Sequence, residues 1–168
     1  NLLGFSATDL PDTSLLTNMR STFAFALNFN YDISNWDVSN VTDMGSMFFN
    51  TNAYNKPLNN WDVSNVLDMG QMFRRADAFD QPLDSWDVGN VTDMQVMFSG
   101  AEIFNQNVGA WRMPNVVRTA GMFGSMSKFN NGGSDSIKDW DVSNVINMTG
   151  MFAFAAAFNQ PLTNWDVS

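Results

Sequence analysis

The 168-residue chain contains no cysteine and no histidine. Without cysteine it can form neither a disulfide framework nor a thiolate metal site, and without histidine it lacks the commonest metal ligand and general base. No apolar run approaches the roughly 18 residues that a membrane span needs. The net charge of −9 opposes binding to phosphate backbones and to anionic lipid surfaces. We therefore expect no nucleic-acid partner and no direct membrane insertion by this segment.

The arrangement of the acidic residues also argues against an enzyme. A glycosidase needs two carboxyl groups in unlike environments within a cleft, whereas the acids of this chain recur at equivalent repeat positions and are expected to be exposed. The sequence shows no phosphate-binding glycine loop, nucleophile elbow or pair of metal ligands. We expect a protein without enzymatic activity and assign it no catalytic residue and no cofactor.

The chain repeats one six-residue sequence, Trp-Asp-Val-Ser-Asn-Val, whole or nearly so. The steps between its tryptophans are 25, 25, 25, 29 and 25 residues, which is the signature of a repeat protein. We expect one repeat domain over 1–168, with a degenerate N-terminal unit at 1–30, a polar surface loop inserted at 131–134 and a last unit truncated at 168. The six tryptophans are Trp36, Trp61, Trp86, Trp111, Trp140 and Trp165.

Within one unit the apolar pattern changes its period. Trp61 and Val63 are two residues apart, so they share one face of a predicted strand, and Asp62 lies on the other face. Over residues 66–79 the apolar residues are spaced by 3, 3, 1, 3 and 3, which predicts an amphipathic helix. Pro82 then ends the helix. The sequence thus predicts an α/β solenoid of about six strand-turn-helix units of 25 residues, stacked because one unit alone cannot offset its chain entropy.

Methionine and asparagine recur with the same regularity. The methionines keep the phase of the predicted core aromatics, so we expect them in the core and not at a soft metal site. An asparagine follows the tryptophan by four residues in each of the first five tryptophan units, and we favour a role in satisfying backbone groups at the stacked turns over a ligand ladder. Three asparagines also match the glycosylation sequon, namely Asn40, Asn90 and Asn147.

The repeat resembles a known family of surface proteins. The sequences Phe79 to Phe98 and Phe158 to Val167 share the pattern Phe-(Asp or Asn)-Gln-Pro-Leu-x-x-Trp-Asp-Val, and the first continues with x-Asn-Val-x-x-Met-x-x-Met-Phe. This pattern is similar to the BspA-like leucine-rich repeats of bacterial surface proteins and lipoproteins, and the resemblance covers the chain from about Leu16 to Ser168. It implies a curved leucine-rich-repeat domain, export to the cell surface, and adhesion or partner binding. It implies no catalytic residue.

Stacking would turn the aspartate that follows each tryptophan into a row on the strand face. Such a row could bind a basic protein patch or calcium, or it could be a solvated face whose aspartates bond to the following turn. The fourth unit carries Arg112 and Arg118 where its neighbours mostly have acids, either to relieve charge repulsion or to mark a recognition patch. The candidate binding residues are Asp37, Asp62, Asp87, Arg112, Asp141, Asp166 and Arg118.

Two functional hypotheses follow from these patterns. The first is an extracellular or cell-surface module that binds a protein or glycan on another cell or matrix through its strand face. The second is a building block whose ends stack onto neighbouring copies of itself to form a fibre or a longer ectodomain.

Overall fold

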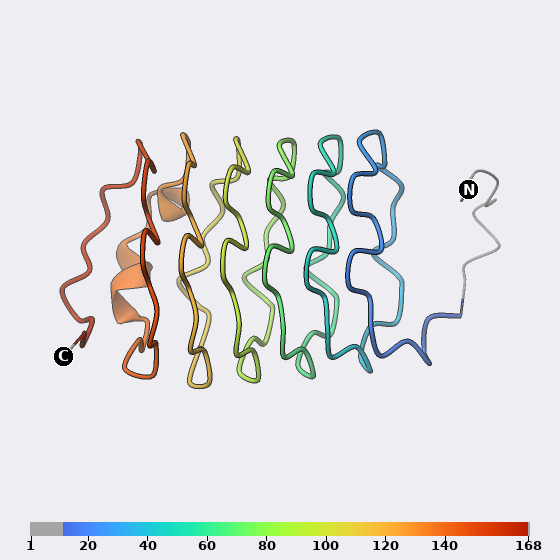
Figure 1. Ribbon diagram of the computed structural model, residues 1–168, viewed down its shortest axis with the longest axis horizontal. Coiled ribbons are helices and arrows are strands. Elements are labelled where there is room, and N and C mark those ends of the chain that lie inside the picture. Colours follow the sequence, from blue (N-terminus) through green and yellow to red (C-terminus); the bar gives the residue numbers. More distant parts are fainter. Residues whose placement is uncertain (1–11, 168) are drawn as a thin grey trace.

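The computed structural model describes residues 12–167, so residues 1–11 of the predicted degenerate unit and Ser168 lie outside the described residues. Successive 25-residue repeats form flattened coils that lie side by side along the long axis of the molecule (Figure 1). The two helices in this range are short 3₁₀ helices, η1 (Asn131–Gly133) and η2 (Asp135–Asp139). Neighbouring coils are joined by single parallel β-bridges, such as Asp43 to Asp68 and Asp68 to Asp93.

The predicted α/β solenoid of strand-turn-helix, leucine-rich-repeat-like units is wrong. Residues 12–167 contain no α-helix and no strand longer than an isolated bridge. In the segment 66–79, the N–H of Met72 donates to the carbonyl of Met69 at 3.1 Å, which closes a three-residue turn. An α-helix would instead bond each N–H to the carbonyl four residues earlier. Consecutive turns therefore produce the apolar spacing that predicted a helix.

Alternate amides between Met69 and Arg75 bond to the next coil. The N–H of Phe73 donates to the carbonyl of Met97 at 2.8 Å, and the N–H of Arg75 donates to that of Ser99 at 3.0 Å. Two residues of the segment, Gln71 and Arg75, have left-handed backbone angles, with φ of 61° and 56°. A right-handed helix cannot contain such residues. Every second N–H from Met69 to Arg75 therefore donates to the neighbouring coil.

The core consists of side chains stacked at equivalent repeat positions. The ring of Phe98 lies 5.5 Å from that of Phe73 and 5.7 Å from that of Phe123, with interplanar angles of 8° and 3°. Within its own coil it stacks on Phe104 at 4.3 Å. Repeated rings in parallel columns give each coil its apolar contacts from the coils on both sides. The expectation that the methionines are buried is confirmed for Met47, Met72, Met97, Met122 and Met151.

Polar side chains also link each coil to the one before it. The indole N–H of Trp86 donates to the carbonyl of Leu58 at 2.9 Å. The predicted backbone role of the asparagine four residues after tryptophan is confirmed, because the amide of Asn65 donates to the carbonyl of Ser39 at 2.8 Å. Equivalent bonds recur at Asn40, Asn90, Asn115 and Asn144.

A second polar column was not predicted. The side-chain oxygen of Asn55 accepts the N–H of Asp80 at 3.0 Å, and that of Asp80 accepts the N–H of Asn105 at 2.9 Å. The column continues to Asn130, whose N–H donates to Asn105 at 2.7 Å. Each side chain thus satisfies one backbone donor in the next coil, so this row also fixes the stacking register.

The four-residue insertion lies in the segment that forms η1 and η2. Asn131 is fully buried there, and its Oδ1 accepts the N–H of Val108 at 2.9 Å. Its Nδ2 donates to the carbonyl of Ser134 at 2.8 Å. Gly132 and Gly133 are exposed and have left-handed backbone angles of 61° and 80° in φ. Asn131 therefore ties the longer coil to its neighbour while the two glycines carry the extra length at the surface.

Candidate functional site

The predicted row of aspartates after each tryptophan is exposed, but it does not lie on a strand. The Oδ1 of Asp37 accepts the backbone N–H of Ser39 at 3.0 Å and its hydroxyl at 2.7 Å. Asp62 and Asp141 make the same pair of bonds with the serines two residues later. These aspartates therefore hold the turn, which is one of the two roles considered for them. The row comprises the exposed residues Asp37, Asp62, Asp87, Arg112, Asp141 and Asp166.

These turn bonds predict a pH-dependent stability. The serine hydroxyls, followed by the serine N–H groups, lower the pKa of Asp37, Asp62 and Asp141 from their ordinary value. A carboxyl group with a lowered pKa in the folded state stabilises the fold above its unfolded pKa of about 4, and this stability is lost as the pH falls through the folded pKa. We expect the melting temperature to fall on acidification below about pH 4.

The triple substitution Asp37→Asn, Asp62→Asn and Asp141→Asn tests this dependence. Asparagine keeps the accepting oxygen of the turn but does not titrate, so the acid-induced decrease in melting temperature should become smaller. Thermal denaturation followed by circular dichroism over a pH series measures both proteins. Equal acid-induced decreases in the variant and the parent would contradict this role.

A second acidic row lies at the bridged positions, where Asp43, Asp68 and Asp93 occupy three successive coils. Arginines hold both ends of this row. The Nε of Arg20 donates to Asp43 at 2.8 Å and its Nη2 pairs with Asp68, while the Nη2 of Arg118 lies 2.9 Å from Asp93. Arg118 thus reduces the repulsion between the carboxylates of this row, which is one of the two roles predicted for it. Each such exposed ion pair contributes about 0–1 kcal/mol. Arg112 makes no ion pair with any residue of 12–167.

Comparing equivalent repeat positions in the sequence did not reveal the ion pairs of Arg20, because its partners Asp43 and Asp68 lie in two different coils. Gly45 leaves the space that its guanidinium occupies, since a Cβ there would lie 2.5 Å from the Arg20 Cζ. Across residues 12–167 no group of three or more acidic side chains is arranged to hold a metal ion. We therefore assign no calcium site to either acidic row.

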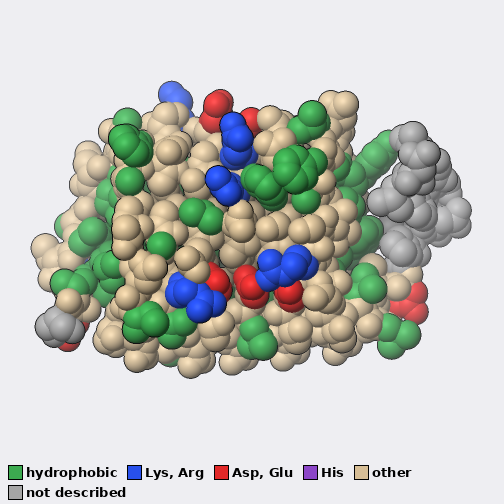
Figure 2. Space-filling model, viewed as in Figure 1, with side chains coloured by type: hydrophobic (Ala, Val, Ile, Leu, Met, Phe, Trp, Pro, Cys, Tyr) green, Lys and Arg blue, Asp and Glu red, His purple; other side chains and the backbone are tan. Residues whose placement is uncertain are grey.

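Above the second acidic row the side chains differ from coil to coil (Figure 2). The backbone there is fixed, because the N–H of Phe25 donates to the carbonyl of Phe49 and that of Asn50 to the carbonyl of Arg74, both at 2.8 Å. The side chains have no common type. We call this surface the variable face and define it by Ala24, Phe25, Phe49, Asn50, Arg74, Arg75, Ser99, Gly100, Gly124, Ser125, Ala153 and Phe154.

An aromatic–arginine patch, made of Phe25, Phe49, Arg74 and Arg75, lies on the variable face. Phe25 is 64% exposed and meets the Phe49 ring edge-on at 4.8 Å between centroids. The guanidinium carbon of Arg74 lies 5.3 Å from the centre of the Phe49 ring, within the range of a cation–π contact. Its Nη1 also donates to the side chain of Gln71 at 3.0 Å.

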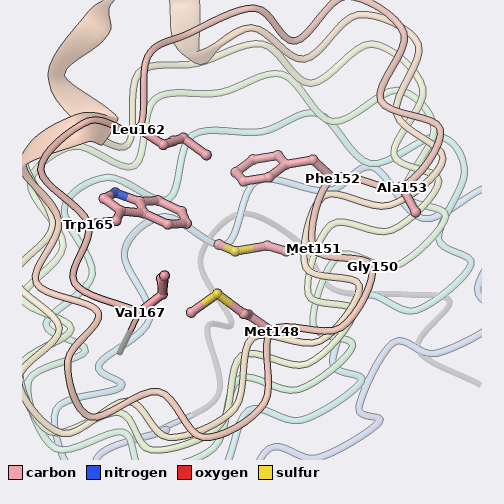
Figure 3. A pocket seen from close by; sticks show the side chains of 8 residues that line it. All are labelled: Met148, Gly150, Met151, Phe152, Ala153, Leu162, Trp165 and Val167. Carbon is pink, nitrogen blue, oxygen red and sulfur yellow. The ribbon is translucent and has the colours of Figure 1, made fainter.

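The last described coil presents an apolar hollow along the axis of the stack. Figure 3 shows Met151, Phe152, Leu162 and Trp165 directed toward one another around it. The hollow continues the ring columns, since Phe152 stacks on Phe123 at 5.6 Å and Trp165 on Trp140 at 6.3 Å. Its lining consists of Met148, Gly150, Met151, Phe152, Ala153, Leu162, Trp165 and Val167.

The stacked coils and their repeated side-chain columns define a repeat protein. The chain matches the family described as "Mycoplasma protein of unknown function, DUF285" over residues 4–111 and 104–168, and it belongs to this family. No curated protein and no solved structure matches the chain. Neither described helix has the length or apolar character needed to span a membrane.

Proposed function

We propose that the chain is a non-enzymatic module of a cell-surface or secreted protein that binds a protein or glycan on another cell or matrix. The observation that carries this proposal is the variable face. Buried core positions repeat the same types of side chain in coil after coil, whereas one row of the variable face contains Phe25, Asn50, Arg75, Gly100 and Ser125 on the same backbone geometry. Since glycine and serine satisfy the fold at these positions, stacking does not account for phenylalanine or arginine there.

The proposed surface location and the general role have two further supports. Repeat proteins use the continuous surface of their stacked units to bind partners. The repeat pattern at Phe79 to Phe98 also resembles BspA-like repeats, which are abundant in bacterial surface proteins and lipoproteins.

A five-glycine variant can remove the side chains of one row of the variable face without disturbing the coils. Phe25, Asn50, Arg75, Ser125 and Phe154 all have left-handed backbone angles, and Gly100 already occupies the same position in another coil. Glycine adopts this conformation without steric strain. We expect labelled domain to bind saturably to cultured animal cells or immobilised matrix proteins, and the five-glycine variant to lose this binding while remaining folded.

The turn-holding aspartates provide the matched comparison. Asp37→Asn, Asp62→Asn and Asp87→Asn together should leave the binding intact if the variable face carries it. If this triple variant alone lost binding, the aspartate row would be the surface that binds the partner. Absence of saturable binding to both cells and matrix would contradict the proposed function.

The alternative function is a building block that stacks end to end. It is favoured by the apolar hollow at the last described coil and by the exposure of Phe154, of which 87% is accessible. The N-terminal side of another copy could continue the ring columns there, and such head-to-tail contacts grow without closing. Light scattering over a concentration series, with and without calcium, tests this alternative. A constant monomer mass would contradict it, and growth without a fixed stoichiometry would support it.

A further inference from the structure

We propose that the aromatic–arginine patch binds a protein segment that carries carboxylates beside an apolar side chain. The inference rests on the proposed function, because it names the chemistry of the partner that the variable face would bind. It depends on two features of the patch, namely two arginines that form no salt bridge within residues 12–167 and an exposed aromatic pair that contacts one of them.

The arginines of the patch are available for a carboxylate partner. The ion pairs within residues 12–167 involve Arg20, Arg118 and Lys138 and include neither Arg74 nor Arg75. The nearby carboxylate of Asp77 accepts a hydrogen bond from Asn52 at 2.6 Å. Arginine recognises carboxylates through paired N–H donors, and such charge-assisted bonds are stronger than neutral ones. Two consecutive arginines therefore offer positive charge for acids on a chain that is otherwise strongly acidic, although Arg75 also lies near enough to Asp77 to oppose the rise that burial causes in the pKa of its carboxyl.

The two phenylalanines supply the apolar part of the site. Phe25 is exposed for most of its surface and is held edge-on against Phe49. Phe49 in turn lies under the guanidinium of Arg74, which limits the positions that this side chain can take. Phenylalanine and arginine are both enriched at protein–protein interfaces, and arginine is also among the residues that dominate their binding energies.

The charge distribution favours a short acidic segment over a long polyanion. A sulfated glycan or nucleic acid is longer than the patch and would approach Asp43, Asp68 and Asp93. These aspartates are the bridged residues of three neighbouring coils, two of which carry patch residues. The overall charge of −9 would repel such a chain at distances up to about 10 Å at ordinary salt. A protein segment can instead place one or two carboxylates on the arginines and an apolar side chain on Phe25.

Selection from a random-peptide display library on the folded domain tests this partner chemistry. We expect enriched peptides to combine aspartate or glutamate with a large apolar residue. Fluorescence anisotropy with the best synthetic peptide should show an affinity loss of at least about tenfold for Arg74→Gln/Arg75→Gln. A separate Phe25→Gly/Phe49→Ser variant should lose a similar factor. Lys56→Gln/Lys128→Gln removes the same charge outside the patch and should change the affinity by less than about twofold.

Several outcomes would overturn the inference. Peptides without acidic residues, peptides unaffected by Arg74→Gln/Arg75→Gln, or no enrichment at all would each do so. Tight binding of a heparin oligosaccharide that depends on the two arginines, without any selected peptide, would identify an anionic glycan site instead. Selected peptides whose binding is weakened only by the five-glycine variant would also overturn the inference. The variable face would then still be the binding surface, but the peptides would contact it outside the patch. Peptides unaffected by any of these variants would contradict the proposed function as well.

Discussion

Replacing Phe98 with alanine is expected to lower the free energy of unfolding by about 3–5 kcal/mol. Its ring is fully buried and stacks on Phe73, Phe104 and Phe123. The substitution therefore removes apolar contacts in three coils at once and leaves a cavity between them. Because domains of this size are stable by about 5–15 kcal/mol, the variant should be close to unfolding. Urea denaturation followed by tryptophan fluorescence measures the difference.

Two comparison variants separate stacking from general sensitivity to mutation. Phe98→Leu keeps most of the volume and should lose about half as much stability or less. Phe154→Ala removes the same group from an exposed ring and should be close to neutral. A Phe98→Ala protein as stable as Phe154→Ala would contradict the stacked core.

Replacing Asn131 with alanine is the second change with a large expected effect. Its buried amide satisfies the N–H of Val108 and the carbonyl of Ser134, and the substitution would leave both backbone groups without these bonds. Each unsatisfied buried group costs about 1–3 kcal/mol. The residue also has φ of 51°, a conformation that alanine adopts less readily than asparagine. We expect a total loss on the order of 3 kcal/mol in chemical denaturation.

Asn131→Gly provides the control for the backbone contribution. Glycine removes the same amide but tolerates the left-handed angle, so the difference between the two variants measures the backbone contribution, which combines strain in the folded state with the greater entropy of glycine in the unfolded chain. Both should be clearly less stable than the parent protein. A glycine variant as stable as the parent would show that the amide does not hold the insertion against its neighbour.

The repeat period and much of the side-chain arrangement could be predicted from the sequence. The spacing of the tryptophans fixed which residues stack, and the phase of the methionines placed Met72 and Met97 in the core. Local chemistry was also readable, because Asn65 at a turn has few partners other than backbone carbonyls and Asp62 precedes a serine by two residues.

The helix could not be told from consecutive turns by apolar spacing alone. Both arrangements bring residues three and four apart to the same side, and the difference lies in where alternate N–H groups donate. A signal was nevertheless present. Glycine occurs inside the predicted helical segments at Gly100, Gly121 and Gly150, all of which have left-handed backbone angles. Glycine is a poor helix former, so its recurrence there argued against a helix.

The candidate surfaces could not be predicted from the sequence of one repeat, because they are formed by side chains from neighbouring coils. Arg20 pairs with Asp68, which is 48 residues away, and no comparison of equivalent positions brings these two side chains together. The patch at Phe49 and Arg74 likewise joins residues from different repeats. Aligning the repeats would have shown where side chains vary, but only the stacked structure shows that these positions form one exposed surface.

The hydrogen bonds between coils are tested most directly by NMR scalar couplings across those bonds. A long-range HNCO spectrum detects a coupling between an amide nitrogen and the carbonyl carbon that accepts its hydrogen bond. We expect couplings from the nitrogen of Phe73 to the carbonyl of Met97 and from that of Met69 to the carbonyl of Asp93. Couplings from the same nitrogens to carbonyls four residues earlier would instead show α-helices and would contradict the stacked coils on which the variable face depends.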